Sequence, residues 1–323
     1  MGTPIISKGF SERRQLGILL AVWGACFIAG SIFTVVILML SGIKNIQDPG
    51  AITNPANSNA FKAMQIVSTF FIFFLPPVIY AFICYKNGWL ALGLQKRVKS
   101  SLIFFSALIM LVTLPVSEML ASLNKAIPLP GGWRKTFDVM EASYESQITA
   151  MVNLDSASGI AVSVLMVAIL PAIFEELLFR GGLQNIIKRW SGNPWLAIIL
   201  TSLIFSAIHG SWYGFIPRTV LGILLGFIFY TTGNLWYSIF MHFVNNFTAL
   251  LFLYIYHLKG VAIKDMPDTF FPWWVGVAAM LVLVGLLVRF YKNNPPQAEV
   301  IVNDSRLNPF GESKVGKMPG DLL

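Results

Sequence analysis

Long runs of apolar residues dominate this chain, and most polar residues lie between those runs. An α-helix needs about 20 mainly apolar residues to cross the roughly 30 Å hydrocarbon core of a bilayer. The sequence contains eight candidate runs, at residues 16–40, 63–84, 101–123, 159 to about 183, 194–209, 219–231, 235–256 and 273–290. The fifth and sixth are short, and Gly210, Gly214 and Pro217 interrupt the chain there, which is typical of broken helices that line a cavity. The pattern predicts an all-α, polytopic membrane protein with about eight transmembrane helices and a central polar cavity.

The amino-acid composition supports a membrane protein. Hydrophobic residues make up 56% of the chain and charged residues only 12%, whereas an ordinary soluble domain has about 25% charged residues. The net charge of +8 does not indicate nucleic acid here, because no basic patch interleaved with aromatic residues is present. We expect these cations to serve topology and contact with anionic lipid head groups, and we expect no nucleic-acid partner.

Basic residues orient the predicted bundle. If the eight runs alternate across the membrane, one side receives Lys8, Arg13, Arg14, Lys86, Lys96, Arg97, Lys99, Lys188, Arg189, Arg289 and Lys292. The positive-inside rule makes that side cytoplasmic and places both termini in the cytosol. We therefore expect a multi-pass protein of the cell membrane, with a bacterial inner membrane as the favoured location.

Two segments lie outside the apolar runs. Residues 124–158 form the predicted extracytoplasmic loop, with an apolar stripe at Trp133, Phe137, Met140, Tyr144, Ile148 and Met151. This three- and four-residue spacing predicts an amphipathic helix at the membrane interface. The helix either covers the functional site or is a packed connector, and the connector is favoured. Residues 294–323 are rich in Pro, Gly and charge without periodicity, which predicts a disordered cytoplasmic tail after one integral membrane domain at residues 1–293.

Three clusters of polar residues fall inside the apolar runs, in a core at residues 159–250. They are Glu175 and Glu176 with Arg180, then His209, then His242 with Asn246. An ionisable side chain in hydrocarbon costs at least a few kcal/mol unless it faces a polar interior, so such residues usually mark a functional site.

Helical spacing predicts different roles for these residues. Glu176 and Arg180 are four residues apart and are expected to form an ion pair. Glu175 points about 100° away from Glu176 on a helix of 3.6 residues per turn, so it is free to face the interior of the bundle. The pattern favours hydrolysis, in which Glu175 and His209 hold and deprotonate a water molecule. His242 and Asn246 would then donate hydrogen bonds to the oxyanion.

The same residues resemble a known family. The runs that carry the resemblance are Glu175-Glu176-Leu177-Leu178-Phe179-Arg180, Phe205-Ser206-Ala207-Ile208-His209 and His242-Phe243-Val244-Asn245-Asn246. They are similar in residue type, spacing and order to the EExxxR, FxxxH and HxxxN motifs of the CPBP intramembrane proteases. That family contains type II CAAX prenyl endopeptidases and bacteriocin-processing or immunity proteins. One such motif alone would be weak, but three in order inside apolar runs are specific.

The resemblance implies an eight-helix membrane fold with a conical cavity open to the cytosol, and a glutamate-dependent endopeptidase. The substrate would be a peptide or protein that reaches the membrane, and the other partner is the lipid bilayer itself. By this resemblance the general base is Glu175, its partner on the water is His209, the oxyanion hole is His242 with Asn246, and the supporting pair is Glu176 with Arg180. Prenylated CAAX proteins are the best-known substrates of the family, but nothing in this sequence specifies a prenyl pocket.

Several alternatives stay open at this point. No cofactor is required for glutamate-activated water, although Glu175, His209 and His242 could complete a zinc site with water. The Glu176–Arg180 pair has either a chemical role or a purely structural one. A non-enzymatic protein, such as a proton-coupled transporter or an immunity-type binder, could use the same polar residues. Asn246 beside His242 favours the enzyme, because a simple proton relay does not require an amide.

Overall fold

The computed structural model describes residues 4–43, 50, 53–261, 265–267, 269–296 and 300–304, and within these residues it is almost entirely helical. Seven of the described helices are long and apolar enough to cross a membrane: Glu12–Leu40, Ser58–Cys84, Ser100–Ala126, Ala157–Ser191, Phe215–Thr232, Leu235–Leu258 and Trp273–Asn293. The all-α, polytopic membrane fold predicted from the sequence is confirmed.

Each of the eight predicted apolar runs falls on a helix. Helices α1 (Glu12–Leu40), α6 (Ser100–Ala126), α12 (Phe215–Thr232), α13 (Leu235–Leu258) and α14 (Trp273–Asn293) carry five of them. The run at residues 194–209 forms α11 (Pro194–Ala207), which has 14 residues and is shorter than the ~20 that a crossing needs. The chain therefore has seven full-length candidate spans and one short apolar helix among the described residues.

The two remaining spans are continuous helices that contain π-helical turns. The first is composed of α3 (Ser58–Thr69), η2 (Phe70–Phe74) and α4 (Leu75–Cys84); the second of α8 (Ala157–Ser163), η3 (Val164–Ile169), α9 (Leu170–Glu176), η4 (Leu177–Gln184) and α10 (Asn185–Ser191). Prolines follow the π-turns, at Pro76 in α4 and Pro171 in α9. Proline has no N–H and clashes with the preceding turn of an α-helix. A π-helical turn before the proline shifts the hydrogen-bonding pattern by one residue, so the helix continues past the proline. Glu175 and Glu176 thus lie between two π-helical segments.

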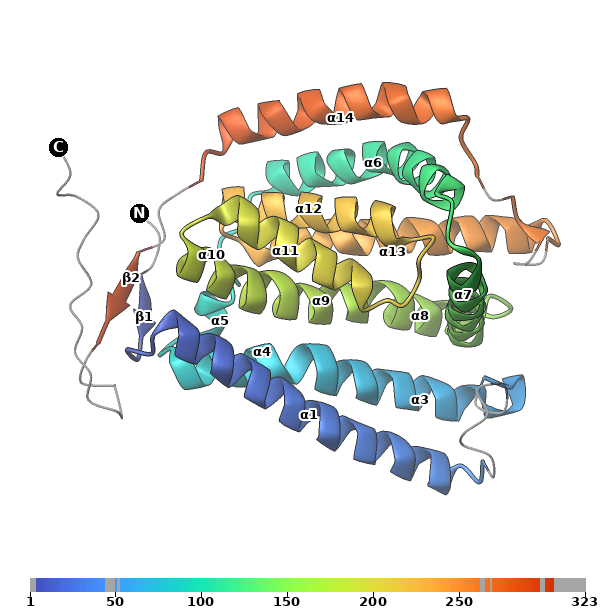
Figure 1. The fold of residues 1–323 in the computed structure, drawn as a ribbon, viewed down its shortest axis with the longest axis horizontal. Coiled ribbons are helices and arrows are strands. Elements are labelled where there is room, and N and C mark those ends of the chain that lie inside the picture. Colours follow the sequence, from blue (N-terminus) through green and yellow to red (C-terminus); the bar gives the residue numbers. More distant parts are fainter. Residues whose placement is uncertain are drawn as a thin grey trace.

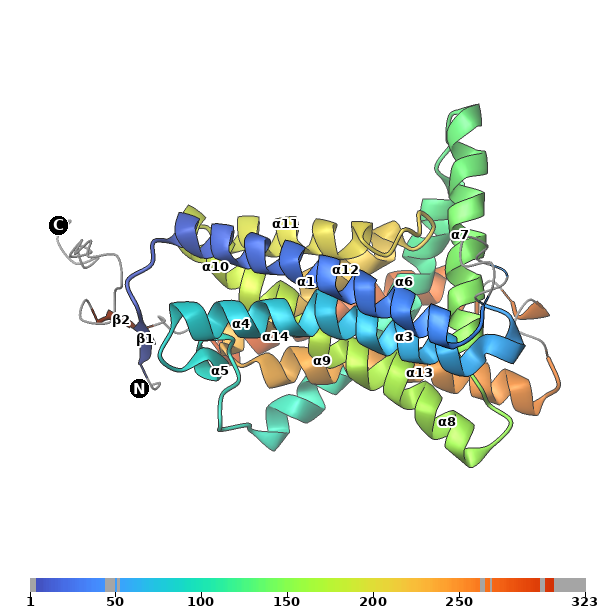
Figure 2. The same cartoon turned by 90° about the horizontal axis from the view of Figure 1, so that it is seen from below.

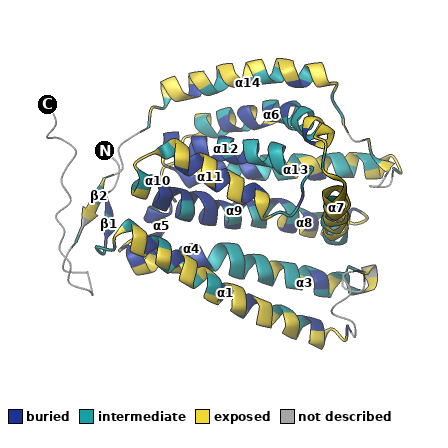
Figure 3. Ribbon diagram, viewed as in Figure 1, coloured by how far each residue is buried: buried dark blue, intermediate teal, exposed yellow. Residues whose placement is uncertain are grey.

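The helices are arranged around a buried central group, as Figure 1 shows. Helix α1 packs against α3 and α4 on one side, and α14 packs against α6 on the other. Between them lie α9, α11, α12 and α13. Of these, α12 is the most buried in Figure 3, and α11 has one exposed face, whereas α1 and α14 are largely exposed. Exposed apolar residues on these outer helices are what contact with lipid requires. The short helices η1 (Pro55–Asn57) and α5 (Gly88–Ala91) lie in connections.

Helix α7 (Gly131–Met151) has a different direction from the bundle. In Figure 2 it runs across the end of the bundle instead of along it. It occupies the predicted loop at residues 124–158, so the expected helix is present. The two chain termini lie at the opposite end (Figure 1).

The terminal segments form a small parallel sheet. Strand β1 (Ile5–Ser7) pairs with β2 (Ile301–Asn303), with Ile5 opposite Ile301 and Ile6 opposite Val302. The predicted disordered tail at 294–323 is therefore wrong at residues 301–303, because this segment finds backbone partners in β1, and its Ile301 and Val302 are β-branched. Residues 305–323 of that tail lie outside the described residues.

Candidate active site

Glu176 is the centre of a fully buried polar network. Its Oε1 atom accepts hydrogen bonds from Nη1 of Arg180 at 2.7 Å and from Nδ1 of His242 at 3.0 Å. Arg180 also donates from Nη2 to the backbone carbonyl of Gly222 on α12 at 3.0 Å. The side chains of Glu176 and Arg180 are 0% and 1% exposed, and they form the ion pair that their spacing predicts. Through Gly222 and His242 this pair connects its own helix to α12 and α13.

Two glycines of α12 allow close approach to its neighbours, which are α11 at Gly222 and the span Ala157–Ser191 at Gly226. A Cβ atom on Gly222 would lie 2.8 Å from Cβ of Ser202, and one on Gly226 would lie 2.7 Å from Oε1 of Gln184. Gln184 donates to the carbonyl of Gly226 at 2.9 Å, as Arg180 does to Gly222 one turn earlier. Small residues that admit close backbone approach, with interhelical hydrogen bonds, are the usual device of membrane bundles.

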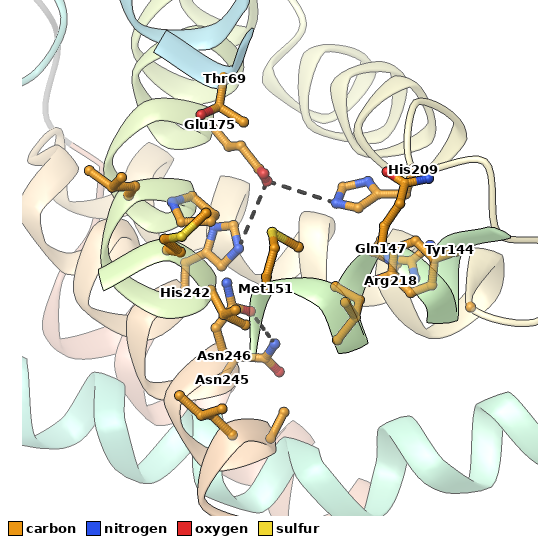
Figure 4. A pocket seen from close by; sticks show the side chains of 18 of the residues that line it. Thr69, Tyr144, Gln147, Met151, Glu175, His209, Arg218, His242, Asn245 and Asn246 are labelled. Carbon is orange, nitrogen blue, oxygen red and sulfur yellow. Dashed lines mark hydrogen bonds and ion pairs between the residues drawn. The ribbon is translucent and has the colours of Figure 1, made fainter. Parts of the chain in front are cut away.

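Glu175 faces away from this network, toward two imidazoles. Its Oε2 atom lies 3.9 Å from Nε2 of His209 and 3.9 Å from Nε2 of His242, as Figure 4 shows. The same oxygen is buried and has no hydrogen-bond partner among the residues that the structure describes. A buried carboxylate oxygen normally has a partner, so its position between two imidazole nitrogens identifies a site where another group binds.

Both imidazoles are held by their Nδ1 atoms. His209 Nδ1 lies 2.7 Å from the backbone carbonyl of Phe205, which only accepts, and His242 Nδ1 lies 3.0 Å from the Arg180-paired carboxylate of Glu176. In each case Nδ1 carries the proton, so in the neutral imidazole Nε2 is an acceptor that points toward Glu175. Phe205, 1% exposed, packs edge-on against both rings at centroid distances of 5.0 and 5.8 Å. It positions the histidines and carries no chemistry of its own.

Asn246 lies one turn after His242 on α13. Its Oδ1 accepts a hydrogen bond from Nδ2 of Asn245 at 3.0 Å, which leaves its own Nδ2 as the donor group. Asn245 and Asn246 both line the same cavity as Glu175 (Figure 4). Of the six predicted site residues, Glu175, His209, His242 and Asn246 line the cavity, while Glu176 and Arg180 lie buried behind it.

The cavity has a volume of about 600 Å³. Apart from the polar residues just described, its lining is mostly apolar and includes Ile66, Phe73, Ile148, Met166, Leu170 and Leu250. A cavity of this size with few convergent polar groups is the usual form of a ligand or substrate site.

Helix α7 closes one side of the cavity. Tyr144, Ile148 and Met151 of its predicted apolar face line the cavity, and Gln147 of the same helix lines it as well. The helix is fastened to the segment after His209 by a hydrogen bond from Ser211 Oγ to Glu141 Oε2 at 2.8 Å, and by stacking of Phe137 on Trp212 at 4.8 Å. The α7 helix thus covers the site, which is the less favoured of the two interpretations of its sequence.

A second hydrogen bond fastens the same segment to α7. Tyr213 donates to Oδ1 of Asp138 at 2.6 Å, and this hydrogen bond raises the pKa of the Tyr213 phenol. The phenol therefore keeps the proton that it donates to the α7 carboxylate.

The cavity extends toward the α7 end of the bundle, opposite the chain termini (Figure 1). Gln147 lines it and is exposed, so the cavity reaches the surface beside α7. The basic residues that predict the cytoplasmic side lie near the other end. If that end is cytoplasmic, the cavity extends away from the cytosol. The prediction that both termini are cytosolic therefore conflicts with the expectation that the cavity opens to the cytosol.

The donor atoms of Glu175, His209 and His242 are of the types that zinc prefers. Among the residues that the structure describes, however, no group of three or more His, Cys, Asp or Glu side chains is arranged to hold a metal ion.

Comparison with known proteins identifies the class of the core. Residues 157–248 match the family model described as Type II CAAX prenyl endopeptidase Rce1-like. The region that holds all three motifs is thus similar to Rce1-like domains of the CAAX-protease type, in agreement with the resemblance of its motifs. The uncharacterized protein YpbD of Bacillus subtilis (strain 168) is 36% identical over 85 residues. That alignment covers 25% of this chain and spans 40% of the length of YpbD. No solved structure gives a significant match.

The sequence patterns missed Arg218 and Gln147, which also line the cavity. Arg218 carried a usable signal, because it is a lone cation beside Pro217 in an otherwise apolar region. Gln147 carried none. Tyr144 was placed on the predicted apolar stripe but was not assigned to the site, because only the fold brings α7 there.

Proposed function

We propose that this protein is an intramembrane endopeptidase that hydrolyses peptide bonds with a water molecule activated by Glu175. The observation that carries the proposal is the unpartnered Oε2 of Glu175, placed 3.9 Å from Nε2 of both His209 and His242 at the wall of a cavity. The match of residues 157–248 to the Rce1-like family supports the same class of reaction.

The three atoms that converge are Oε2 of Glu175 and Nε2 of His209 and of His242. With neutral imidazoles, all three accept hydrogen bonds and none donates to another. A water molecule supplies two donors, so it can bridge the Glu175 carboxylate and the lone pair of His209. In this position the water oxygen attacks the carbonyl carbon of the peptide bond while one water proton passes to Glu175. Glu175 later gives this proton to the amine that leaves, so the carboxylate is regenerated and the proton count is balanced.

The oxyanion formed by this attack needs donors on the other side of the carbonyl. Asn246 Nδ2 is one such donor, since Oδ1 of the same amide is already engaged by Asn245. His242 is a second donor when its Nε2 carries a proton, and the hydrogen bond from Nδ1 to the Glu176 carboxylate holds the ring in place. Donors placed where negative charge develops usually provide one of the largest catalytic effects.

This mechanism needs no metal ion. Glu175, His209 and the two donors account for the base, the water and the oxyanion without one. Cleavage that persists in the presence of a strong chelator is the expected result, and loss of cleavage that zinc restores would assign a metal-dependent reaction instead.

We also propose that both termini face the cytosol and that the cavity faces the opposite side of the membrane. The basic residues near the termini support this orientation through the positive-inside rule. The substrate would then be a peptide or protein segment that reaches the outer half of the bilayer beside α7. The apolar lining of the cavity favours a segment with apolar side chains.

The class of function is tested with purified protein in lipid vesicles and a broad library of peptides. We expect new N-termini by mass spectrometry, which shows peptide-bond cleavage. Proton-dependent uptake of a solute or peptide without any cleaved product would contradict the proposal and indicate a carrier.

A further inference from the structure

Arg218 is a second cation beside the catalytic group. It lies near the start of α12 and lines the same cavity as Glu175 and His209. Figure 4 shows it on the His209 side of the cavity, next to Gln147 and Tyr144. The other arginine of the site, Arg180, is already paired with Glu176.

The guanidinium of Arg218 has no acidic partner among the residues that the structure describes. Its Nη1 atom is shielded from solvent and makes no hydrogen bond. The nearby acids of α7 are already engaged, since Glu141 accepts from Ser211 and Asp138 accepts from Tyr213. Glu175 is the acid of this cavity, but no carboxylate within ion-pair distance of the Arg218 guanidinium is found among the described residues. A partly buried guanidinium without a hydrogen-bonded carboxylate is unfavourable, so this site favours a ligand that brings a negative group.

The surroundings hold this guanidinium in one place. Its Cζ lies 5.3 Å from the centre of the Tyr144 ring on α7, a cation–π contact. On its other side it lies against Gly214, where an added Cβ would be 2.5 Å from Nη2 of Arg218. A planar guanidinium fixed in this way matches a carboxylate through two parallel hydrogen bonds.

We propose that Arg218 is a specificity-determining residue that binds a carboxylate of the peptide substrate, either its C-terminal carboxylate or an acidic side chain. This inference rests on the proposed peptidase function and deepens it. By holding one negative group of the peptide, Arg218 fixes which peptide bond lies over Glu175. Tyr144 belongs to α7, so the helix that covers the cavity also completes this subsite.

The test uses dye-labelled apolar peptides that differ only in their negative group. One ends in a free carboxylate, one ends in an amide, and one ends in an amide but carries a single internal Glu. Binding to the purified protein in detergent is measured by fluorescence anisotropy, and cleavage is measured in parallel. We expect one acidic peptide to bind about tenfold tighter than the neutral amide, consistent with charge-assisted hydrogen bonds. Which acidic peptide it is decides between the two sources of the carboxylate.

Two variants separate this role from a structural one. Arg218→Gln should abolish the preference for the acidic peptide and leave binding of the amide unchanged, while Arg218→Lys should retain part of the preference. Gly214 has φ −90° and ψ 0°, which any residue can adopt, so Gly214→Ala displaces the guanidinium without removing its charge. We expect it to weaken the preference as well, which keeps the test decisive if Arg218→Gln fails to fold.

The outcomes distinguish this inference from the proposed function. Equal binding of all three peptides to the wild type, or an unchanged preference in Arg218→Gln, overturns the carboxylate subsite even if peptides are cleaved. A preference that depends on Arg218 without any cleavage supports the subsite and contradicts the peptidase.

Discussion

Glu176 accepts a hydrogen bond from Nδ1 of His242 at 3.0 Å through the same oxygen that binds Arg180. The adjacent carboxylate, Glu175, contacts the other nitrogen of that imidazole from 3.9 Å. The two consecutive glutamates therefore act on opposite edges of one histidine. Glu176 orients the ring through Nδ1, and Glu175 faces its Nε2 edge.

Removing the charge of Glu176 should affect both stability and activity. Glu176→Gln leaves Arg180 without its counter-charge in a fully buried position, and breaking such a pair costs about 3–5 kcal/mol. Thermal unfolding in detergent measures this loss. The double variant Glu176→Gln/Arg180→Met removes both charges, so it should recover most of the stability while cleavage stays low, because His242 still lacks its partner. Recovery of full activity in the double variant would show that Glu176 has only a structural role.

His209 should be required for cleavage and dispensable for folding. Its side chain is 20% exposed, and its Nδ1 hydrogen bond to the Phe205 carbonyl is local. His209→Ala should lower kcat about 10²–10⁴-fold, the usual range for loss of a proton-transfer partner, with little change in the unfolding temperature. Cleavage at the wild-type rate would place the water elsewhere in the cavity.

The neighbouring amides of α13 provide a matched pair. Asn246→Ala removes the proposed oxyanion donor and should lower kcat about 10²–10³-fold with little change in KM. Asn245→Ala removes only the group that orients Asn246, so its effect should be several-fold smaller. Steady-state kinetics on one cleaved peptide measures both, and equal losses in the two variants would argue against a specific role of Asn246.

The side of the membrane reached by the cavity can be tested by labelling single cysteines. Cys26 and Cys84 are both buried, and both are replaced by alanine to give the background. An impermeant maleimide added outside intact cells should label Gln147→Cys, beside the cavity, and not Lys86→Cys, at the opposite end of the bundle. Both residues are exposed. The reverse labelling would place the cavity on the cytosolic side and contradict the proposed orientation.

The helices and the buried ionisable residues can be predicted from the sequence, because a lipid environment restricts both the backbone and the side chains. All eight apolar runs fall on helices, since a chain in hydrocarbon must satisfy its own backbone groups. Glu175, His209 and His242 stand out for the same reason, because ionisable residues are rare in such runs. The resemblance to the three ordered motifs implies that these residues converge. In the structure, both histidines lie 3.9 Å from one oxygen of Glu175. The short α11 runs obliquely across the central helices in Figure 1.

Other features depend on tertiary contacts that no local pattern reports. The helix continues past Pro171 with a π-helical segment before it. The sequence alone does not distinguish this arrangement from a bend at the proline. The position of α7 over the cavity depends on Phe137 and Glu141 meeting Trp212 and Ser211, and nothing in either segment specifies the other. The pairing of β1 with β2 joins residues from opposite ends of the chain, so the tail alone has no signal for it.

The most direct test of the mechanism is peptide cleavage by Glu175→Gln compared with the wild type. The substitution keeps the size of the side chain and removes both its negative charge and its ability to take a proton, and thermal unfolding confirms that the variant is folded. We predict at least about a 10³-fold loss of kcat in the folded variant, within the range for removal of a general base, with peptide binding retained. Cleavage by folded Glu175→Gln at a rate close to that of the wild type would show that Glu175 does not activate the water.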